Sequence, residues 1–170
     1  MNLNPAHYFI KRYHSPDLKP NELKRMLNLW FPFLMNRIQI ISINEDFHEM
    51  QVCLKHSFWN RNPNKSVWGG SITSAIDPFF PVMMKQIVLR KGIHTEFYSK
   101  AVHVEFLKKV ESHLYFHFKI NDTEVMEAEE KLYVDSFRVK FCMDSFPQNN
   151  LFHHNGKKWI QSTCNRSAPD

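Results

Sequence analysis

The sequence predicts an α+β domain with a mostly antiparallel sheet. Segments that alternate between apolar and polar residues lie on both sides of one long apolar helix, which is expected over about residues 70–89. These segments do not follow the regular spacing of βαβ units, which argues against a parallel sheet. With 170 residues and no repeat or linker, the chain is expected to form one domain over residues 1–170, with its core over residues 22–163.

The first helix is expected to start at Pro20, after an irregular segment over residues 1–19. Apolar residues at helical spacing from Leu23 to Phe31 form one stripe, and Pro32 is expected to end the helix. Such a stripe could bind a membrane surface or a partner protein. Packing on the domain's own sheet is the favoured interpretation.

The remaining elements follow from alternation and from stop signals. Lys91-Gly92 is a typical end for the long helix, and Asn121-Asp122 offers a cap for a helix over residues 123–132. A polar loop is expected over residues 147–156 and a disordered tail over residues 165–170. Strands are predicted over residues 37–44, 50–58, 95–108, 113–121, 137–143 and 159–163.

Composition limits the function classes. The apolar fraction of 43% is enough for a core, and the net charge of +5 permits anionic partners without naming one. Basic residues are spread along the chain and no nucleic-acid motif is present, so no nucleic-acid partner is expected. Three cysteines without a CxxC pair, and the lack of a secretory leader, favour a cytoplasmic location. The long apolar helix contains Asp77, Pro78 and Lys85, which argue against a membrane span.

Two adjacent glycines, Gly69 and Gly70, are the most informative pair in the chain. At the start of a helix they leave backbone N–H groups approachable, which suits a developing negative charge. Asp77 lies seven residues after Gly70, about two turns or roughly 10 Å along an ideal helix. One copy of the helix could therefore not bring both groups to one substrate, and the chemistry requires two copies.

A structural interpretation competes at each position. Asp77-Pro78 is a common helix start, in which the carboxylate only caps the helix. If the helix begins near Ser71 instead, Pro78 leaves the Ser74 carbonyl without its donor, and a kink is expected there. The glycine pair could equally serve a tight turn packed against the sheet. For Trp59 and Trp68, core packing is favoured over lining an acyl pocket.

Other catalytic centres find no support in the sequence. Ten histidines are present, but none stands in an HxH or HExxH motif or at a Cys/His ligand spacing, so no metal is expected. No serine or cysteine stands in a nucleophile-elbow motif, and no P-loop or dinucleotide fingerprint occurs, so no cofactor is expected.

Three segments together resemble a known family: residues 26–33, residues 58–62 and residues 68–80, with a further echo over residues 102–108. They resemble bacterial hotdog-fold acyl-CoA thioesterases of a thioesterase-like group, related to phenylacetyl-CoA-type thioesterases. The resemblance implies a curved antiparallel sheet wrapped around a long central helix. It also implies a homodimer with active sites between subunits, or a homotetramer.

The resemblance further implies roles for single residues in the hydrolysis of an acyl-CoA or related acyl thioester. Gly70 would donate its N–H to the oxyanion, Asp77 would be base or nucleophile, and Asn62 would orient water or the thioester. Substrate binding would involve Gly69, Trp68 and Asn60. Many such enzymes carry His where this chain has Trp68. That departure keeps open an alternative, a non-catalytic acyl-binding hotdog protein.

Overall fold

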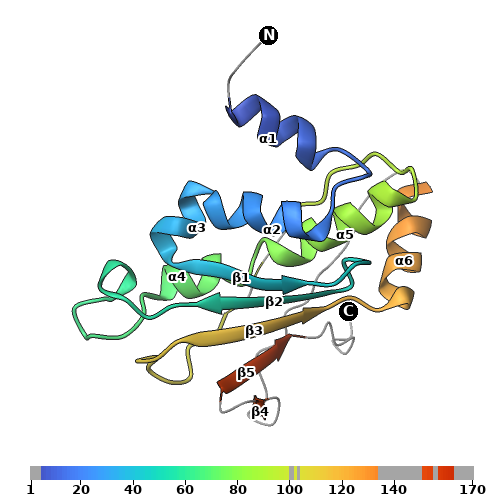
Figure 1. Cartoon of the computed structure of the whole chain (residues 1–170). Helices are drawn as coiled ribbons and strands as arrows, with labels where there is room; N and C mark the ends of the chain where they lie inside the picture. Colours follow the sequence, from blue (N-terminus) through green and yellow to red (C-terminus); the bar gives the residue numbers. More distant parts are fainter. Residues whose placement is uncertain (1–4, 100–101, 103, 134–150, 155–156, 163–170) are drawn as a thin grey trace.

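The computed structural model describes residues 5–99, 102, 104–133, 151–154 and 157–162 (Figure 1). Its helices are α1 (Pro5–Tyr13), α2 (Pro20–Leu29), α3 (Phe31–Asn36), α4 (Gly69–Ser74), α5 (Phe79–Arg90) and α6 (Asp122–Tyr133), with a 3-10 turn η1 (Phe58–Asn60). Its strands are β1 (Ile38–Ile43), β2 (Glu49–Leu54), β3 (Leu114–Lys119), β4 (Leu151–His154) and β5 (Lys157–Ser162). In Figure 1, α2, α3 and α5 lie on the same side of the sheet.

The strands form one sheet in the order β1-β2-β3-β5-β4. The pairs β1–β2, β2–β3 and β4–β5 are antiparallel, whereas β3 and β5 are parallel. The predicted α+β class with a mostly antiparallel sheet is therefore confirmed. A sheet of this kind with a buried helix on one face is compatible with a hotdog fold.

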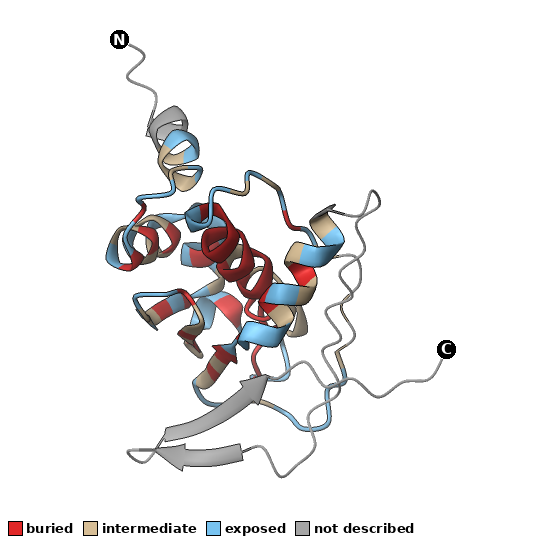
Figure 2. Ribbon diagram, turned by 90° about the vertical axis from the view of Figure 1, so that its right-hand side faces the viewer, coloured by how far each residue is buried: buried red, intermediate tan, exposed pale blue. Residues whose placement is uncertain are grey.

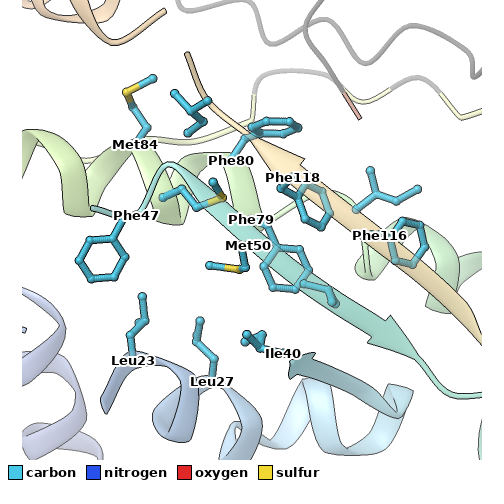
Figure 3. Close-up of a cluster of buried hydrophobic side chains, with 14 of the residues drawn as sticks. Leu23, Leu27, Ile40, Phe47, Met50, Phe79, Phe80, Met84, Phe116 and Phe118 are labelled. Atoms are coloured by element: carbon cyan, nitrogen blue, oxygen red, sulfur yellow. The ribbon is translucent and has the colours of Figure 1, made fainter. Parts of the chain in front are cut away.

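One face of the sheet carries the core. Side chains from β1, β2 and β3 meet those of α2, α3 and α5 there, and the alternation of each strand sends every second residue to this face. Phe79 links the layers, with its ring 5.4 Å from that of Phe33 and 5.0 Å from that of Phe118. Figure 3 labels the central members: Leu23, Leu27, Ile40, Phe47, Met50, Phe79, Phe80, Met84, Phe116 and Phe118.

The N-terminal helices differ in part from the expectation. Leu23 and Leu27 are buried and α2 packs on β1, so packing on the domain's own sheet is confirmed. The α2 helix ends at Leu29, and Pro32 lies in the first turn of α3, where its missing N–H leaves no helix bond unmade. The first helix thus ends before Pro32 as expected, although a second helix contains this proline. An irregular segment throughout residues 1–19 was wrong, because α1 lies within it.

The expected long helix is interrupted. Its first turns form α4, and i to i−4 bonds continue from the Ala75 amide to Ser71 and from the Asp77 amide to Thr73. Pro78 has no N–H to continue them, and α5 begins at Phe79. A kink was expected at the proline, and the structure shows a full interruption there, so a single helix over residues 70–89 was wrong.

Among the elements whose burial the structure describes, α5 is the most deeply buried (Figure 2). Its last turn closes as the sequence predicts, because Gly92 has φ of 81° and its amide donates to the Leu89 carbonyl at 3.0 Å. The Ile93 amide donates to the Val88 carbonyl at 3.1 Å. These two bonds form a Schellman motif, which needs a left-handed residue at the position of Gly92.

Several predicted strand limits change. The stretch over residues 95–108 was expected to be a strand, but none of its described residues belongs to one. The β2 strand ends at Leu54, and η1 occupies the end of the range that was predicted as strand up to residue 58. The polar loop over residues 147–156 contains β4. The strand predicted over residues 137–143 and the tail over residues 165–170 lie outside the described residues.

Within the described part of the chain, no helix has both the length and the apolar character needed to cross a membrane.

Candidate active site

The segment that leads into α4 is anchored by Asn60, whose side chain is buried. Its Nδ2 donates hydrogen bonds to the carbonyls of Asn36 and Lys55, at 2.9 and 2.8 Å. Its Oδ1 accepts from the amide and the hydroxyl of Ser57, at 3.0 and 3.3 Å. The bond to Asn36 joins η1 to the end of α3. Both N–H groups and the oxygen of the Asn60 side-chain amide are engaged in these bonds. The substrate contact predicted for it would require breaking these bonds.

Asn62 closes a tight loop with Ser66. Its Nδ2 donates to the Ser66 hydroxyl at 2.8 Å, and its Oδ1 accepts from the Ser66 amide at 3.1 Å. Lys65 in this loop has φ of 64°, a left-handed conformation that such turns require. To orient water or a thioester, as predicted, Asn62 would first have to release Ser66.

The α4 helix begins at the glycine pair, so a helix start near Ser71 is confirmed. The carbonyl of Trp68 accepts from the amides of Ser71 and Ile72, at 3.0 and 3.3 Å, and no side chain caps the helix. Among the residues that the structure describes, none accepts a hydrogen bond from the amide of Gly69 or Gly70. These two N–H groups are the open donors that an oxyanion would need.

Two aromatic rings lie against the glycines. A Cβ atom built on Gly70 would come within 2.5 Å of the Trp68 ring, and one built on Gly69 within 3.0 Å of the Phe106 ring. A side chain at either glycine would force the neighbouring ring to shift. Close packing is therefore present as the structural interpretation expected, but the nearest atoms belong to Trp68 and Phe106, neither of which lies in a strand of the sheet. Core packing of the tryptophans was wrong, because Trp68 is 58% exposed and Trp59 is 74% exposed.

Asp77 lies after the last turn of α4 and is half-buried. Its carbonyl accepts from the Ser99 hydroxyl at 3.3 Å, whereas its carboxylate has no hydrogen-bond partner among the described residues. The N-cap of α5 is Pro78, and no side chain caps that helix. A helix does begin beside Pro78, as the competing interpretation predicted, but the Asp77 side chain does not cap it.

Asn36 joins these pieces, and sequence reasoning did not find it. Its carbonyl accepts from Asn60, and its Oδ1 accepts from the buried hydroxyl of Ser71 at 2.7 Å. The Trp68 amide in turn donates to the Asn60 carbonyl at 2.8 Å. These bonds hold Asn60, Trp68 and the start of α4 together. In the same chain, Asp77 lies two helical turns away from the start of α4. No pattern around Asn36 in the sequence signals this role.

A polar hollow of about 480 Å³ lies elsewhere, where β2 begins and β3 ends. His48 lines it, with Nε2 3.3 Å from a carboxylate oxygen of Asp122. Glu49 lines it as well, and a hydrogen bond from Lys119 is the main reason that the pKa of Glu49 lies below its ordinary value. None of the catalytic or substrate-binding residues predicted from the sequence lines this hollow. Its members come from two distant segments, which no motif in the sequence connects.

Among the described residues, no group of three or more His, Cys, Asp or Glu side chains is arranged to hold a metal ion.

The comparison with protein families shows which family the chain belongs to. A family model described as a domain of unknown function (DUF4442) matches residues 21–141. The chain belongs to this family. The DUF4442 match covers α2 to α6 and includes Asn60, Asn62, Trp68, the glycine pair and Asp77. No curated protein and no solved structure matches the chain.

Proposed function

We propose that this DUF4442 domain hydrolyses acyl thioesters, with acyl-CoA as the substrate, at sites formed between two copies of the chain. One observation carries the proposal. A short helix has two unengaged glycine amides at its start, and a half-buried carboxylate without a described partner follows its end. Uncommitted donors and an uncommitted carboxylate are what this hydrolysis requires. The resemblance over residues 26–33, 58–62 and 68–80 points to the same chemistry.

The reaction assigns one task to each group. Asp77 would remove a proton from water, and the oxygen would attack the thioester carbonyl carbon. The Gly70 N–H would stabilise the negative charge on the carbonyl oxygen. When the C–S bond breaks, the thiolate leaves and takes up a proton, and the free acid remains. The net positive charge of the chain favours the approach of the CoA phosphates.

Dimerisation is part of the proposal. Helical bonds continue from α4 to Asp77, so Gly70 and Asp77 of one copy are separated by roughly 10 Å along the helix axis. A carboxylate at that distance cannot activate a water molecule beside the Gly70 amide. Gly70 of one subunit would therefore work with Asp77 of the partner subunit.

Asp77→Asn tests the chemistry. We expect hydrolysis of a panel of medium- and long-chain acyl-CoAs to fall by at least about a hundredfold, the usual contribution of a general base. The assay follows release of the free thiol. Glu130→Gln, a similar change at an exposed position on α6, is the matched control and should keep full activity. Turnover like that of the unaltered protein in Asp77→Asn would exclude the proposal.

Complementation tests the shared site. Gly70→Pro removes the N–H in the first turn of α4, where a helix tolerates proline, and Trp68→Ala is added to the same chain to remove the ring that a side chain at position 70 would meet. Each variant alone should be inactive, whereas mixing Gly70→Pro with Asp77→Asn should restore activity. A mixed dimer contains one site with both natural residues. If mixing restores nothing although mixed dimers form, the shared site is wrong.

A non-catalytic acyl-binding protein is the second candidate, and the position of the Trp68 ring favours it. That ring lies over Gly70, and the chain lacks the His that many related enzymes have there. This candidate predicts that acyl-CoA binds without turnover across the panel. Hydrolysis that Asp77→Asn abolishes would exclude it.

A further inference from the structure

One end of the molecule carries an exposed apolar surface. It is formed by α3, the residue before it, and η1, which meets α3 at the left of Figure 1. Exposure there ranges from 42% for Leu34 to 79% for Phe58. We call this surface the aromatic end; its members are Trp30, Phe31, Leu34, Met35, Phe58 and Trp59.

The two parts of the aromatic end are held at fixed positions. The hydrogen bond from Asn60 to the Asn36 carbonyl joins η1 to the last residue of α3. The guanidinium of Arg61 lies 5.9 Å from the centre of the Phe58 ring. These side chains are exposed on a short helix and a turn, and none of them lines the polar hollow where β2 begins and β3 ends. The aromatic end is therefore an exposed surface whose two parts are joined to each other.

All the Asp, Glu, Lys and Arg residues in the two chain segments that carry the aromatic end are basic. No acidic residue occurs over residues 23–44 or over residues 50–76, the two segments that carry the aromatic end. The same segments contain six basic residues, of which four are exposed. Those four are Arg25, Arg37, Arg61 and Lys65.

An acidic residue that approaches from a third segment is already paired. The Val67 amide donates to the Val110 carbonyl at 2.8 Å, which brings Glu111 near this end. Glu111 pairs with Lys109 at 2.6 Å, so its charge is balanced within its own segment. Glu111 therefore does not cancel the positive charge of the four exposed basic residues.

We propose that the aromatic end docks on an anionic lipid surface. Tryptophan and phenylalanine insert at the boundary between head groups and acyl chains, and basic residues at the rim attract anionic head groups. A second copy fits less well, because a twofold interface would place the same basic residues opposite one another without acidic partners. This inference goes beyond the proposed hydrolysis and uses neither Gly70 nor Asp77.

Co-sedimentation of the full chain with vesicles tests it. We expect binding to vesicles in which about a third of the phosphatidylcholine is replaced by phosphatidylserine, and at least about tenfold weaker binding to pure phosphatidylcholine. Phe58→Ser combined with Trp59→Ser should reduce binding at least about tenfold. Arg61→Gln combined with Lys65→Gln should reduce it about twenty-fivefold, at roughly fivefold for each basic residue.

Matched controls lie elsewhere on the surface. Tyr98→Ser with Met126→Ser removes side chains that are 78% and 66% exposed, and Lys11→Gln with Lys131→Gln removes two exposed charges. Both control variants should bind like the unaltered protein. Equal binding to both kinds of vesicle, or equal losses in the control variants, would overturn the proposal. So would loss of a dimer, seen by light scattering, in an aromatic-end variant that bound vesicles no worse than the unaltered protein.

Discussion

Lys85, buried in the middle of α5, forms a two-pronged ion pair with Glu96. Its Nζ lies 2.7 and 2.8 Å from the two carboxylate oxygens, and 3.1 Å from Nδ1 of His14. The same ammonium lies 4.4 Å from the centre of the Tyr13 ring. Only 3% of the Lys85 side chain is exposed, so these contacts replace its lost hydration. The cluster ties the end of α1 and the segment after α5 to the core helix.

Removing the carboxylate of Glu96 should lower the unfolding free energy more than removing the ammonium group of Lys85. Glu96→Gln leaves a buried ammonium without its counter-charge, and we expect a loss of about 2–3 kcal/mol in unfolding free energy, less than for a fully buried pair because Glu96 is half-exposed. Lys85→Met replaces the charge with an apolar chain and should cost less than about 1 kcal/mol. Urea unfolding of both variants measures the difference. The reverse order would contradict this account of the cluster.

Asn60 should be a stability residue. Asn60→Ala empties a buried position and leaves part-buried groups of Asn36, Lys55 and Ser57 without partners, so a loss of about 2–3 kcal/mol is expected in urea unfolding. Asn64→Ala in the same loop removes an exposed side chain and should change stability by less than about 0.5 kcal/mol. Equal stabilities for the two variants would show that the Asn60 bonds contribute nothing net.

Gly70 and Trp68 should be energetically coupled. Gly70→Ala places a methyl group within 2.5 Å of the Trp68 ring. This clash should lower the unfolding free energy by about 1 kcal/mol, despite the better helix propensity of alanine. In a Trp68→Ala background the clash is gone, and the same change should be neutral or stabilising. A double-mutant cycle measures the coupling. Additive effects would mean that the ring moves aside without cost.

Glu49 should make part of the stability depend on pH. The Lys119 hydrogen bond is the largest cause of its lowered pKa, and His117 adds to the shift. A lowered folded-state pKa stabilises the fold above the ordinary value of 4.5, and this contribution is lost as the pH falls through the folded value. Because Glu49 is 39% exposed, we expect less than about 1 kcal/mol.

Thermal unfolding at about pH 6 and about pH 3 can measure that contribution. The unaltered protein should lose more stability between the two conditions than Glu49→Gln, and added salt should narrow the gap. Glu45→Gln, at an exposed turn position beside β1, is the control and should follow the unaltered protein. Identical losses of stability in Glu49→Gln and in the unaltered protein would mean that the Glu49–Lys119 pair contributes nothing to the dependence of stability on pH.

Local chemistry predicted several elements correctly. Alternation located β2 and β3, since a strand with one buried face repeats every two residues, and a run rich in isoleucine located β1. Gly92 marked the end of α5, because the Schellman motif needs a left-handed residue there. Pro78 marked the break between α4 and α5, because it lacks the N–H that the helix needs.

The candidate site was predicted only in part. The glycine pair indicated the start of α4, and both glycine amides are unengaged among the described residues. The sequence could not show that Asn60 and Asn62 are occupied by internal hydrogen bonds, because their partners are chosen by the folded chain. Nor could it show that the Trp68 ring lies over Gly70.

By itself, then, the sequence determined which segments could become strands and helices and where helices must break, since these depend on side-chain period and on missing donors. Tertiary structure decided which of them did. The stretch over residues 95–108 alternates like a strand, but its described residues belong to no strand of the sheet, in which β3 lies between β2 and β5. Alternation shows only that a segment could form a strand, because its backbone bonds depend on the partner that folding brings beside it. The exposure of Trp59 and the burial of Lys85 were likewise decided by the partners that folding brought, or did not bring, to each side chain.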